Sequence, residues 1–316
     1  MFRRSAPWLA GLLAASAVAV AGCGSSSNAS PTTTSAHAGF PVSVHGAGGV
    51  TVIARAPHRI VSLSPTSTED LFALGAGPQV VAVDDESDYP ANAPRTKLSG
   101  FQPNVEAIAG YRPDLVVISD ESPTSLAPAL RKLGIPVLIN PAARSLGEAY
   151  AEIEQLGVAT GHDAQARALV GRMKSQIAAS VRAAAGRGRG LSVYDEISQE
   201  YYAAASGTVI GQLFTLFGLR DIADRAPDPQ GLGYPQLSDE YIVSADPDIV
   251  LLTDTVCCDQ TAASVAHRAG WSHMTAVRKH TIVALSEDIA SRWGPRTPAL
   301  AAEIARAIQA ARAAGV

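Results

Sequence analysis

A long amphipathic helix is expected in the middle of the chain, over residues 163–186. Its apolar side chains recur at helical spacing and are Val170, Met173, Ile177, Val181 and Ala184. Asp163 is expected to cap its first turn, and Gly186, with the glycines that follow, to end it. At ~1.5 Å per residue such a helix spans about 35 Å, which is the width of a small domain. A helix of this length either connects two domains or packs on one sheet as an ordinary amphipathic helix.

The segments on both sides of this helix alternate between short apolar runs and helical patterns. The strands expected before it are 41–44, 50–53, 59–63, 80–83, 115–119 and 135–139, with helices from Ser67 onward and at 105–109, 126–133 and 146–156. The strands expected after it are 191–194, 201–203, 249–253 and 281–285, with helices at 210–217, 241–243 and 298–313. Glu69 and Asp70 are expected in the first turn of the helix that begins near Ser67. Apolar strands separated by helices predict two α/β halves, each with a mostly parallel sheet covered on both faces.

The first 22 residues have the order of a bacterial lipoprotein signal. Arg3 and Arg4 precede an apolar stretch over 8–20, and small residues then lead to Cys23, which would become the lipidated first residue of the mature chain. The apolar stretch is shorter than the ~20 residues that a membrane-spanning helix needs. Residues 23–40 are polar and small, and are expected to form a flexible tether. The domains expected beyond it are a lobe over 41–160, the connecting helix over 161–187 and a second lobe over 188–316.

One internal similarity suggests that the two halves are related. Residues 104–117 and 238–251 each hold a short helical segment with a glutamate, followed by Pro-Asp and an apolar strand. The spacing from Glu106 to Asp114 equals the spacing from Glu240 to Asp248. Pro-Asp also begins strands in unrelated chains, so this similarity alone does not establish a duplication.

Together these segments resemble the metal-chelate class of ABC-transporter substrate-binding proteins, which carry ferric siderophores, haem or vitamin B12. The resemblance covers about 57–313, and its most specific segments are 59–65 (RIVSLSP), 87–90 (SDYP), 105–116 and 240–248. It implies an α/β fold of two Rossmann-like lobes joined by a single long rigid helix, with the ligand held in the cleft between the lobes. Among members of the class, the motifs are most similar to those of the vitamin B12-binding one.

The resemblance also implies that each lobe docks on a permease dimer through one glutamate. By position these residues are Glu106 and Glu240. Carboxylates on opposite lobes suit that role, because they can enter arginine pockets of a two-fold permease and fix the orientation through charge-assisted hydrogen bonds. The alternative is a pair of solvated surface glutamates that contribute little.

The ligand is expected beside the loops at the carboxyl ends of the strands. The residues predicted to bind it are Ser64, Pro65, Glu86, Phe101, Tyr202, Tyr234, Asp288, Arg292, Trp293 and Arg296. As in the vitamin B12-binding member, an acid lies four residues before an arginine, at Asp288 and Arg292, and these two would bind the amide rim of the corrin. The open alternatives are that Arg292 and Arg296 pair with carboxylates at a helix start, and that Trp293 packs beneath the loop instead of stacking on ligand.

Acidic side chains are frequent in the predicted cleft loops and are Asp85, Glu86, Asp120, Glu121, Asp254 and Asp259. They would repel a strongly anionic ferric chelate such as dicitrate. A neutral or cationic chelate, a corrinoid or a hydroxamate, fits better, although Arg292 and Arg296 act in the opposite direction. Aromatic residues make up only 5% of the chain, which is little for the flat apolar contact that a corrin face requires.

Cys257 and Cys258 are adjacent and follow a predicted strand. Thiols outside the cytoplasmic membrane tend to be oxidised, so a vicinal disulfide that stiffens a cleft loop is predicted, with free thiols or metal ligation as alternatives. The chain has no H-E-x-x-H pattern, no G-x-S-x-G pattern and no glycine-rich phosphate loop. No catalytic residue, metal site or cofactor is therefore predicted.

The sequence thus predicts a monomeric lipoprotein, anchored by its N-terminal lipid on the extracytoplasmic face of the bacterial cell membrane. It would bind a metal chelate (corrinoid, ferric siderophore or haem) and deliver it to an ABC permease dimer. The net charge of −4 argues against a nucleic-acid partner. The alternatives are a two-lobed extracytoplasmic enzyme that processes a chelate, and a sensing lipoprotein without a permease.

Overall fold

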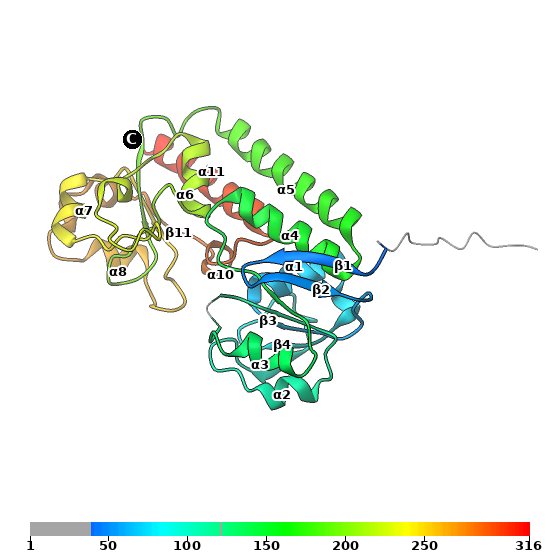
Figure 1. Ribbon diagram of the computed structural model, residues 1–316. Coiled ribbons are helices and arrows are strands. Elements are labelled where there is room, and N and C mark those ends of the chain that lie inside the picture. The colour runs from blue at the N-terminus through cyan, green and yellow to red at the C-terminus, as the bar shows by residue number, and fades with distance from the viewer. Residues whose placement is uncertain (1–38, 121) are drawn as a thin grey trace, which may run out of the picture. The chain divides into compact units, whose positions relative to one another are not determined.

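The two runs of alternating strands and helices each fold around a parallel sheet, which confirms the predicted α/β class (Figure 1). The computed structural model describes residues 39–120 and 122–316. The predicted signal segment, Cys23, most of the predicted tether and Glu121 lie outside the described residues. Both sheets belong to one unit of the chain, residues 37–316. No helix in the described part of the chain is long and apolar enough to span a membrane.

The N-terminal lobe contains a five-stranded sheet in the order β5-β4-β3-β6-β7, with every pair parallel. Its strands are β3 (Ile60–Leu63), β4 (Val80–Asp84), β5 (Arg95–Leu98), β6 (Leu115–Ile118) and β7 (Val137–Ile139), and an antiparallel hairpin of β1 (Val42–Gly46) and β2 (Gly49–Ile53) precedes them. Its helices are α1 (Pro65–Leu74), η1 (Gly77–Gln79), α2 (Val105–Gly110), α3 (Leu126–Lys132) and α4 (Leu146–Thr160). Successive residues of β3 enter different cores: Ile60 packs with α1 and α4, and Val61 with α2 and α3. Successive side chains of a strand point to opposite faces of the sheet, so both faces of this sheet are buried under helices.

The C-terminal lobe contains a four-stranded parallel sheet in the order β11-β10-β8-β9. Its strands are β8 (Ser192–Glu196), β9 (Arg220–Asp221), β10 (Ile249–Leu252) and β11 (Ile282–Ala284). Its helices are α6 (Val209–Phe217), η2 (Ala223–Arg225), α7 (Asp239–Ala245), α8 (Ala262–Ala266), η3 (Trp271–His273), α9 (Thr275–Arg278), α10 (Glu287–Ala290) and α11 (Thr297–Ala313). Val193 of β8 packs with α6 and α11, whereas the next residue, Tyr194, packs on the other face with Trp271. This sheet is also covered on both sides.

The long helix α5 (Asp163–Ala184) joins the two lobes and contributes to both hydrophobic cores. Val170 and Met173, in its first half, pack in the N-terminal core with α4. Ile177 and Ala184, in its second half, pack in the C-terminal core with α11. Figure 1 shows α4 lying along α5, and the two helices are in contact. Its 22 residues correspond to about 33 Å of helix, enough to reach from one core into the other.

The internal similarity has a common structural role in the two lobes. In the N-terminal lobe the carboxylate of Asp114, just before β6, accepts a hydrogen bond from the backbone amide of Arg59 at 2.8 Å. In the C-terminal lobe the carboxylate of Asp248, just before β10, accepts one from the amide of Ser192 at 2.7 Å. Each aspartate thus ties the start of its own strand to the start of the neighbouring strand. Because Arg59 and Ser192 correspond, the positions along β3 and β8 can be matched one by one.

Several expectations about local structure were wrong. Asp163 is the first residue of α5 and not its cap, because its carboxylate pairs with Arg167 one turn further on, at 2.6 Å. The helix ends at Ala184, before the predicted Gly186, because Ala185 already adopts the left-handed conformation.

Two further differences concern segments that surround the cleft. The segment 201–203 forms only isolated bridges, since Tyr201 has a φ of 65°, which interrupts an extended chain. Helix α1 begins two residues before Ser67, because Ser64 caps it and Pro65 takes the first helical position. Glu69 and Asp70 therefore lie beyond its first turn.

Candidate functional site

The junction between β3 and α1 is held by hydroxyl groups. The Oγ atom of Ser64 accepts a hydrogen bond from the backbone amide three residues further on, at 3.4 Å, and thereby caps α1. Behind this cap, the hydroxyl of Thr68 lies 2.9 Å from the hydroxyls of both Ser62 and Ser87. These bonds connect the end of β3 to the loop that follows β4.

Two adjoining cavities lie against this junction and the C-terminal lobe. The N-side cavity, about 380 Å³, is lined by the ends of β3 and β4 and their loops, and by residues 287–288 and 291–293. The C-side cavity, about 300 Å³, is lined mostly by the C-terminal lobe, with Asp195 and Tyr234 among its residues. Glu287, Ser291 and Trp293 line both cavities, so α10 and the residues just after it form their common wall. Volumes of this order are typical of sites for small molecules.

Two arginines between α10 and α11 are paired with carboxylates, most of them on the N-terminal lobe. The guanidinium of Arg292 lies 2.7 Å from Asp88, 3.1 Å from Glu69 and 3.3 Å from Asp288. Arg296 contacts both carboxylate oxygens of Glu69, whose side chain has no exposed area. The pairing alternative therefore describes both arginines, although Arg292 also lines the N-side cavity.

Trp293 is fixed in the wall that the cavities share. Its Nε1–H donates a hydrogen bond to Oε2 of Glu152, on α4, at 3.0 Å. Glu152 is 6% exposed, and burial raises the pKa of its carboxyl to about 8. A carboxyl of α4 thus positions an aromatic ring that faces both cavities.

The carboxyl end of β8 carries two consecutive acids in different environments. Glu196 makes two hydrogen bonds of 2.6 Å with the guanidinium of Arg268. Asp195 is completely buried, and neither of its carboxyl oxygens has a hydrogen-bond partner among the described residues. Burial, together with the nearby Asp221 and Asp254, raises the pKa of Asp195 well above its usual range. Asp195 lines the C-side cavity, and Glu196 does not.

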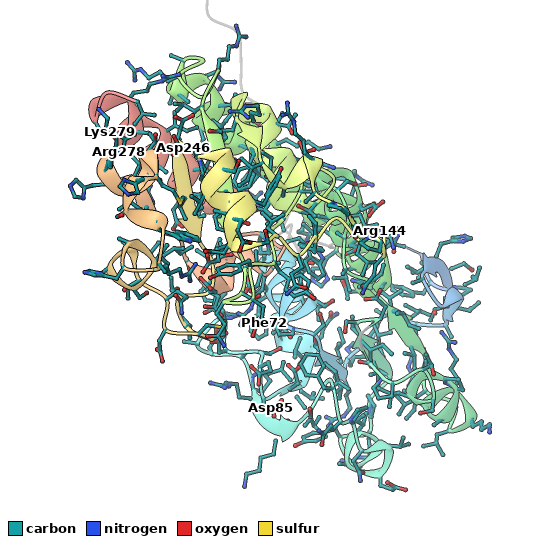
Figure 2. All side chains as sticks on the ribbon, turned by 90° about the vertical axis from the view of Figure 1, so that its left-hand side faces the viewer. Phe72, Asp85, Arg144, Asp246, Arg278 and Lys279 are labelled. Carbon is teal, nitrogen blue, oxygen red and sulfur yellow. A yellow bond between two sulfur atoms is a disulfide. The ribbon has the colours of Figure 1, made fainter. Side chains whose placement is uncertain are left out.

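The acidic loops differ in part from the prediction. Glu86 lines the N-side cavity, and Asp85, labelled in Figure 2, is exposed on the loop that follows β4. Asp120 and Asp259 are also exposed. Asp254 was expected in the cleft but lines neither cavity: it is fully buried, and burial and the neighbouring Glu196 raise its pKa.

The loop that follows β10 is tied to α10. The carboxylate of Glu287 accepts hydrogen bonds from the backbone amides of Val256 and Cys257. In the structure Cys257 and Cys258 are joined by a disulfide. Since Glu287 lines both cavities, this loop is anchored at their common wall.

Eight of the ten residues predicted to bind ligand line the two cavities; they are Ser64, Pro65, Glu86, Phe101, Asp288, Arg292 and Trp293 in the N-side cavity and Tyr234, again with Trp293, in the C-side cavity. The other two line neither. Tyr202 forms an isolated backbone bridge with Gln236, and Arg296 lies 4.3 Å from the centre of the Tyr89 ring. The structure brings most of the predicted residues together, and their contact with ligand remains a prediction.

Three acids that line the cavities were missed. Glu287 directly precedes Asp288, so it lies one residue outside the predicted segment 288–296. Asp84 is the last residue of β4 and lines the N-side cavity, and burial raises the pKa of its carboxyl to about 6. Asp195 and Glu196 end a strand whose residues are all buried, and this acidic pair was a signal in the sequence that could have marked the site.

The two glutamates predicted to dock on a permease occupy matching positions. Glu106 is the second residue of α2, which Asn104 caps, and Glu240 is the second residue of α7, which Ser238 caps. Both glutamates are exposed. The equal spacing in the sequence therefore reflects the same helix position in each lobe.

Comparison with known proteins assigns the chain to a family. The family described as "Periplasmic binding protein" matches residues 60–289. The uncharacterized ABC transporter substrate-binding lipoprotein YvrC of Bacillus subtilis is 32% identical over 98% of both chains. The chain belongs to the periplasmic binding protein family. A cobalamin-binding protein of Halobacterium salinarum is 32% identical over 81% of this chain and 71% of its own length. A solved structure, a possible iron-binding (periplasmic solute-binding) protein from Staphylococcus epidermidis, has a TM-score of 0.71 and 25% identity, covering 80% of this chain and 99% of its own.

Membership identifies the chain as an ABC-transporter substrate-binding protein, as the sequence predicted. This family consists of solute-binding proteins that are not enzymes, so the alternative of a chelate-processing enzyme is set aside. Within the described residues, no group of three or more His, Cys, Asp or Glu side chains could hold a metal ion.

Proposed function

We propose that the chain is the lipid-anchored substrate-binding protein of an ABC importer and that its ligand is a corrinoid such as vitamin B12. The cobalamin-binding relative from Halobacterium salinarum supports this ligand, because its similarity extends over most of both chains. The lipoprotein YvrC, similar over 98% of both chains, supports lipidation at Cys23, although that residue lies outside the described part of the chain. The chain would then be held on the extracytoplasmic face of the membrane.

The observation that carries the ligand class is the charge around the cavities. Arg292 and Arg296 do not offer an open cationic site, since both are paired with carboxylates. Those carboxylates are Glu69, Asp88 and Asp288, three against two guanidinium groups. Further acids line the cavities and are Asp84, Glu86 and Glu287, together with Asp195, whose raised pKa reduces its contribution to the negative charge. An anionic ferric chelate would meet negative charge there, whereas a neutral corrinoid or a cationic hydroxamate would not.

The aromatic residues provide the flat contact that a corrin needs. Phe101 is 60% exposed and Tyr234 is 41% exposed, so neither is committed to a hydrophobic core. Phe101 lines the N-side cavity, Tyr234 the C-side cavity, and Trp293 the wall between them. Although the aromatic content of the chain is low, three of its aromatic residues gather at the site, where a macrocycle can pack on them.

Isothermal titration calorimetry of the full-length chain in mild detergent tests the ligand. Vitamin B12 should give saturable binding, and ferric dicitrate should give none. Arg292→Ala should weaken B12 binding, because its removal leaves Glu69, Asp88 and Asp288 without this cation beside the N-side cavity. If B12 gives no heat and a cationic ferric hydroxamate does, the corrinoid assignment is wrong and the transport assignment stands.

We infer that Glu106 and Glu240 dock this monomeric protein on a permease dimer. Their matching helix positions on the two lobes support this role, because a two-fold permease offers two equivalent sites. Co-purification of the permease with the chain tests the partner. A chain that binds chelate but never co-purifies with a permease would instead be a sensing lipoprotein.

A further inference from the structure

The C-side cavity combines an apolar wall with one buried acid, Asp195, that has no hydrogen-bond partner among the residues that the structure describes. We propose that this cavity is a subsite for an alkyl arm of the ligand that ends in a hydrogen-bond donor, an amide or an ammonium group, and that Asp195 accepts from that donor. The proposal rests on the proposed function, since the arm belongs to the chelate that the protein carries. It adds a specificity-determining residue that the family resemblance did not indicate.

The lining of the cavity suits a short alkyl arm. Its volume is about 300 Å³. Its apolar lining residues are Ala143, Ile197, Ala204, Val209, Ile210, Ala290 and Trp293. Methylene groups of an arm would displace water from this wall, which is favourable because it removes apolar surface from water. The C-side cavity adjoins the N-side cavity at Trp293, so an arm can enter the C-side cavity while the macrocycle stays at the N-side cavity.

The carboxyl of Asp195 lines the cavity and is not satisfied by the protein, but it has no solvent-exposed area, so a ligand arm has to displace the side chains that cover it. Its two oxygens have no hydrogen-bond partner among the described residues, and the nearby ionisable groups that act on it are the acids Glu196, Asp221 and Asp254. Arg268 is already bound to Glu196, the residue next to Asp195. A buried polar group without a partner is unfavourable, so a donor that reaches it gains more than it would at an exposed acid.

The other polar groups of the cavity are satisfied or solvated. The hydroxyl of Thr253 donates to the carbonyl of Glu196 at 2.9 Å. Glu287 accepts from two backbone amides of the loop that follows β10. Ser291 and Tyr234 are exposed to solvent. Asp195 is therefore the lining group with the largest unmet hydrogen-bonding capacity.

The position that Asp195 occupies in β8 corresponds to Ser62 in β3, and there the side chain has a hydrogen-bond partner. In the N-terminal lobe Asp114 accepts from the amide of Arg59, and the residue three positions after Arg59 is Ser62. In the C-terminal lobe Asp248 accepts from the amide of Ser192, and the residue three positions after Ser192 is Asp195. The hydroxyl of Ser62 is 2.9 Å from the hydroxyl of Thr68 and is thus satisfied within its lobe. The equivalent position in β8 carries a larger, acidic group that the C-terminal lobe leaves without a partner.

An amide arm suits Asp195 in either protonation state. Burial and the neighbouring acids raise the pKa of this carboxyl well above its usual range, so they favour its protonated form relative to an exposed aspartate. A protonated carboxyl donates its O–H to the amide carbonyl and accepts from the amide N–H, whereas a carboxylate accepts from the N–H alone. An ammonium arm would bind only the carboxylate, as an ion pair. Substitution of Asp195 should therefore change the affinity for an amide arm differently from the affinity for an ammonium arm.

The test is calorimetry of the full-length chain in detergent with two probes, cyanocobalamin, which carries amide arms, and ferrioxamine B, which carries an ammonium arm. Asp195→Ala should weaken binding of whichever probe the parent binds by about tenfold, the effect of one lost hydrogen bond to a buried group. Asp195→Asn should leave an amide ligand within about threefold, since an amide pair keeps both hydrogen bonds, but should weaken an ammonium ligand by about tenfold. Asp70→Asn is the matched control: this buried acid also has an oxygen without a partner among the described residues, but it lines neither cavity and is not one of the acids that act on Asp195, so the affinity of this variant for the probe should stay within about twofold of the parent.

The outcomes separate the subsite from the proposed function. If the parent binds cyanocobalamin and Asp195→Ala binds it equally well, the subsite is refuted and the corrinoid function stands. If the parent binds only ferrioxamine B and Asp195→Asn loses it, the subsite is supported and the corrinoid assignment falls. Binding of neither probe overturns both. The unfolding midpoint of ligand-free Asp195→Asn should be at or above that of the parent, and a fall of more than about 5 °C would assign Asp195 a structural role and overturn the proposal.

Discussion

The carboxylate of Glu69 is the point at which the structure can be tested most directly. This side chain has no exposed area and binds Arg292 at 3.1 Å and Arg296 through both of its oxygens. It lies on α1 of the N-terminal lobe, whereas both arginines lie between α10 and α11, more than 220 residues further along the chain. Glu69→Gln keeps the volume of the side chain but removes its charge and turns an amide N–H₂ toward a guanidinium group.

The expected loss of stability follows from burial and from what remains paired. Breaking a buried ion pair by removing one partner costs about 3–5 kcal/mol. The arginine side chains are 11% and 19% exposed, and Arg292 keeps Asp88 and Asp288, so the lower end of that range applies, about 3 kcal/mol. At about 2–4 °C per kcal/mol for a protein near this size, the unfolding midpoint should fall by about 6–12 °C.

Differential scanning calorimetry of the ligand-free chain measures this midpoint. Arg306→Gln is the control, because its pair with Glu303 is long, at 3.9 Å, and its side chain is 68% exposed. Such a surface pair contributes little, so the midpoint of the control should move by about 1 °C or less. A Glu69→Gln protein that melts within about 2 °C of the parent would refute the view that the buried glutamate stabilises the fold through the two arginines.

Stability should fall as the pH rises, because burial raises the pKa of several acids. These acids are Asp84 (about 6), Glu152 (about 8), Asp221 (about 7) and Asp254. The folded protein then binds more protons than the unfolded chain. The stability that these acids contribute is complete below about pH 4 and is lost as the pH rises through their raised pKa values. The calorimetric unfolding midpoint should be about 5 °C higher at pH 5.5 than at pH 8.5, and an unchanged midpoint would contradict the prediction. Glu106→Arg and Glu240→Arg should each abolish permease-dependent uptake of the chelate in cells. The calorimetric affinity for the chelate should stay within about twofold, since neither side chain lines a cavity. Normal uptake by either variant would exclude docking of that glutamate on the permease. Iodoacetamide without reductant should add no mass to Cys257 or Cys258, and alkylation of both would exclude the disulfide.

Much of the architecture could be predicted because it depends on local patterns. Apolar strands separated by helical segments indicated two parallel sheets, and the apolar stripe of 163–186 indicated the helix that enters both cores. The repeated spacing around Glu106 and Glu240 reflects two capped helices of the same design. The failures were also local: Tyr201 adopts a positive φ that no pattern in 201–203 revealed.

The site was predictable in composition but not in its pairing. Residues near the carboxyl ends of strands do line the cavities, as the topology of parallel sheets requires. Which acid meets which arginine could not be predicted, because Glu69 and Arg296 approach each other only when the lobes are folded. Likewise, Asp195 and Glu196 are neighbours in the sequence, yet only one of them is bound by Arg268.

The sequence by itself therefore determined the α/β class, the connecting helix and the family, since these follow from the order and periodicity of apolar residues and from short motifs. The tertiary structure alone decided the charge of the cleft, because Glu69, Asp88 and Asp288 surround Arg292 and Arg296, for which the sequence had left both ligand binding and carboxylate pairing open. It also decided that Asp195 is buried at a cavity wall, without a hydrogen-bond partner in the described part of the chain. Both facts arise from contacts between segments far apart in the chain, and electrostatic interactions depend on distance and burial in space and not on separation in sequence.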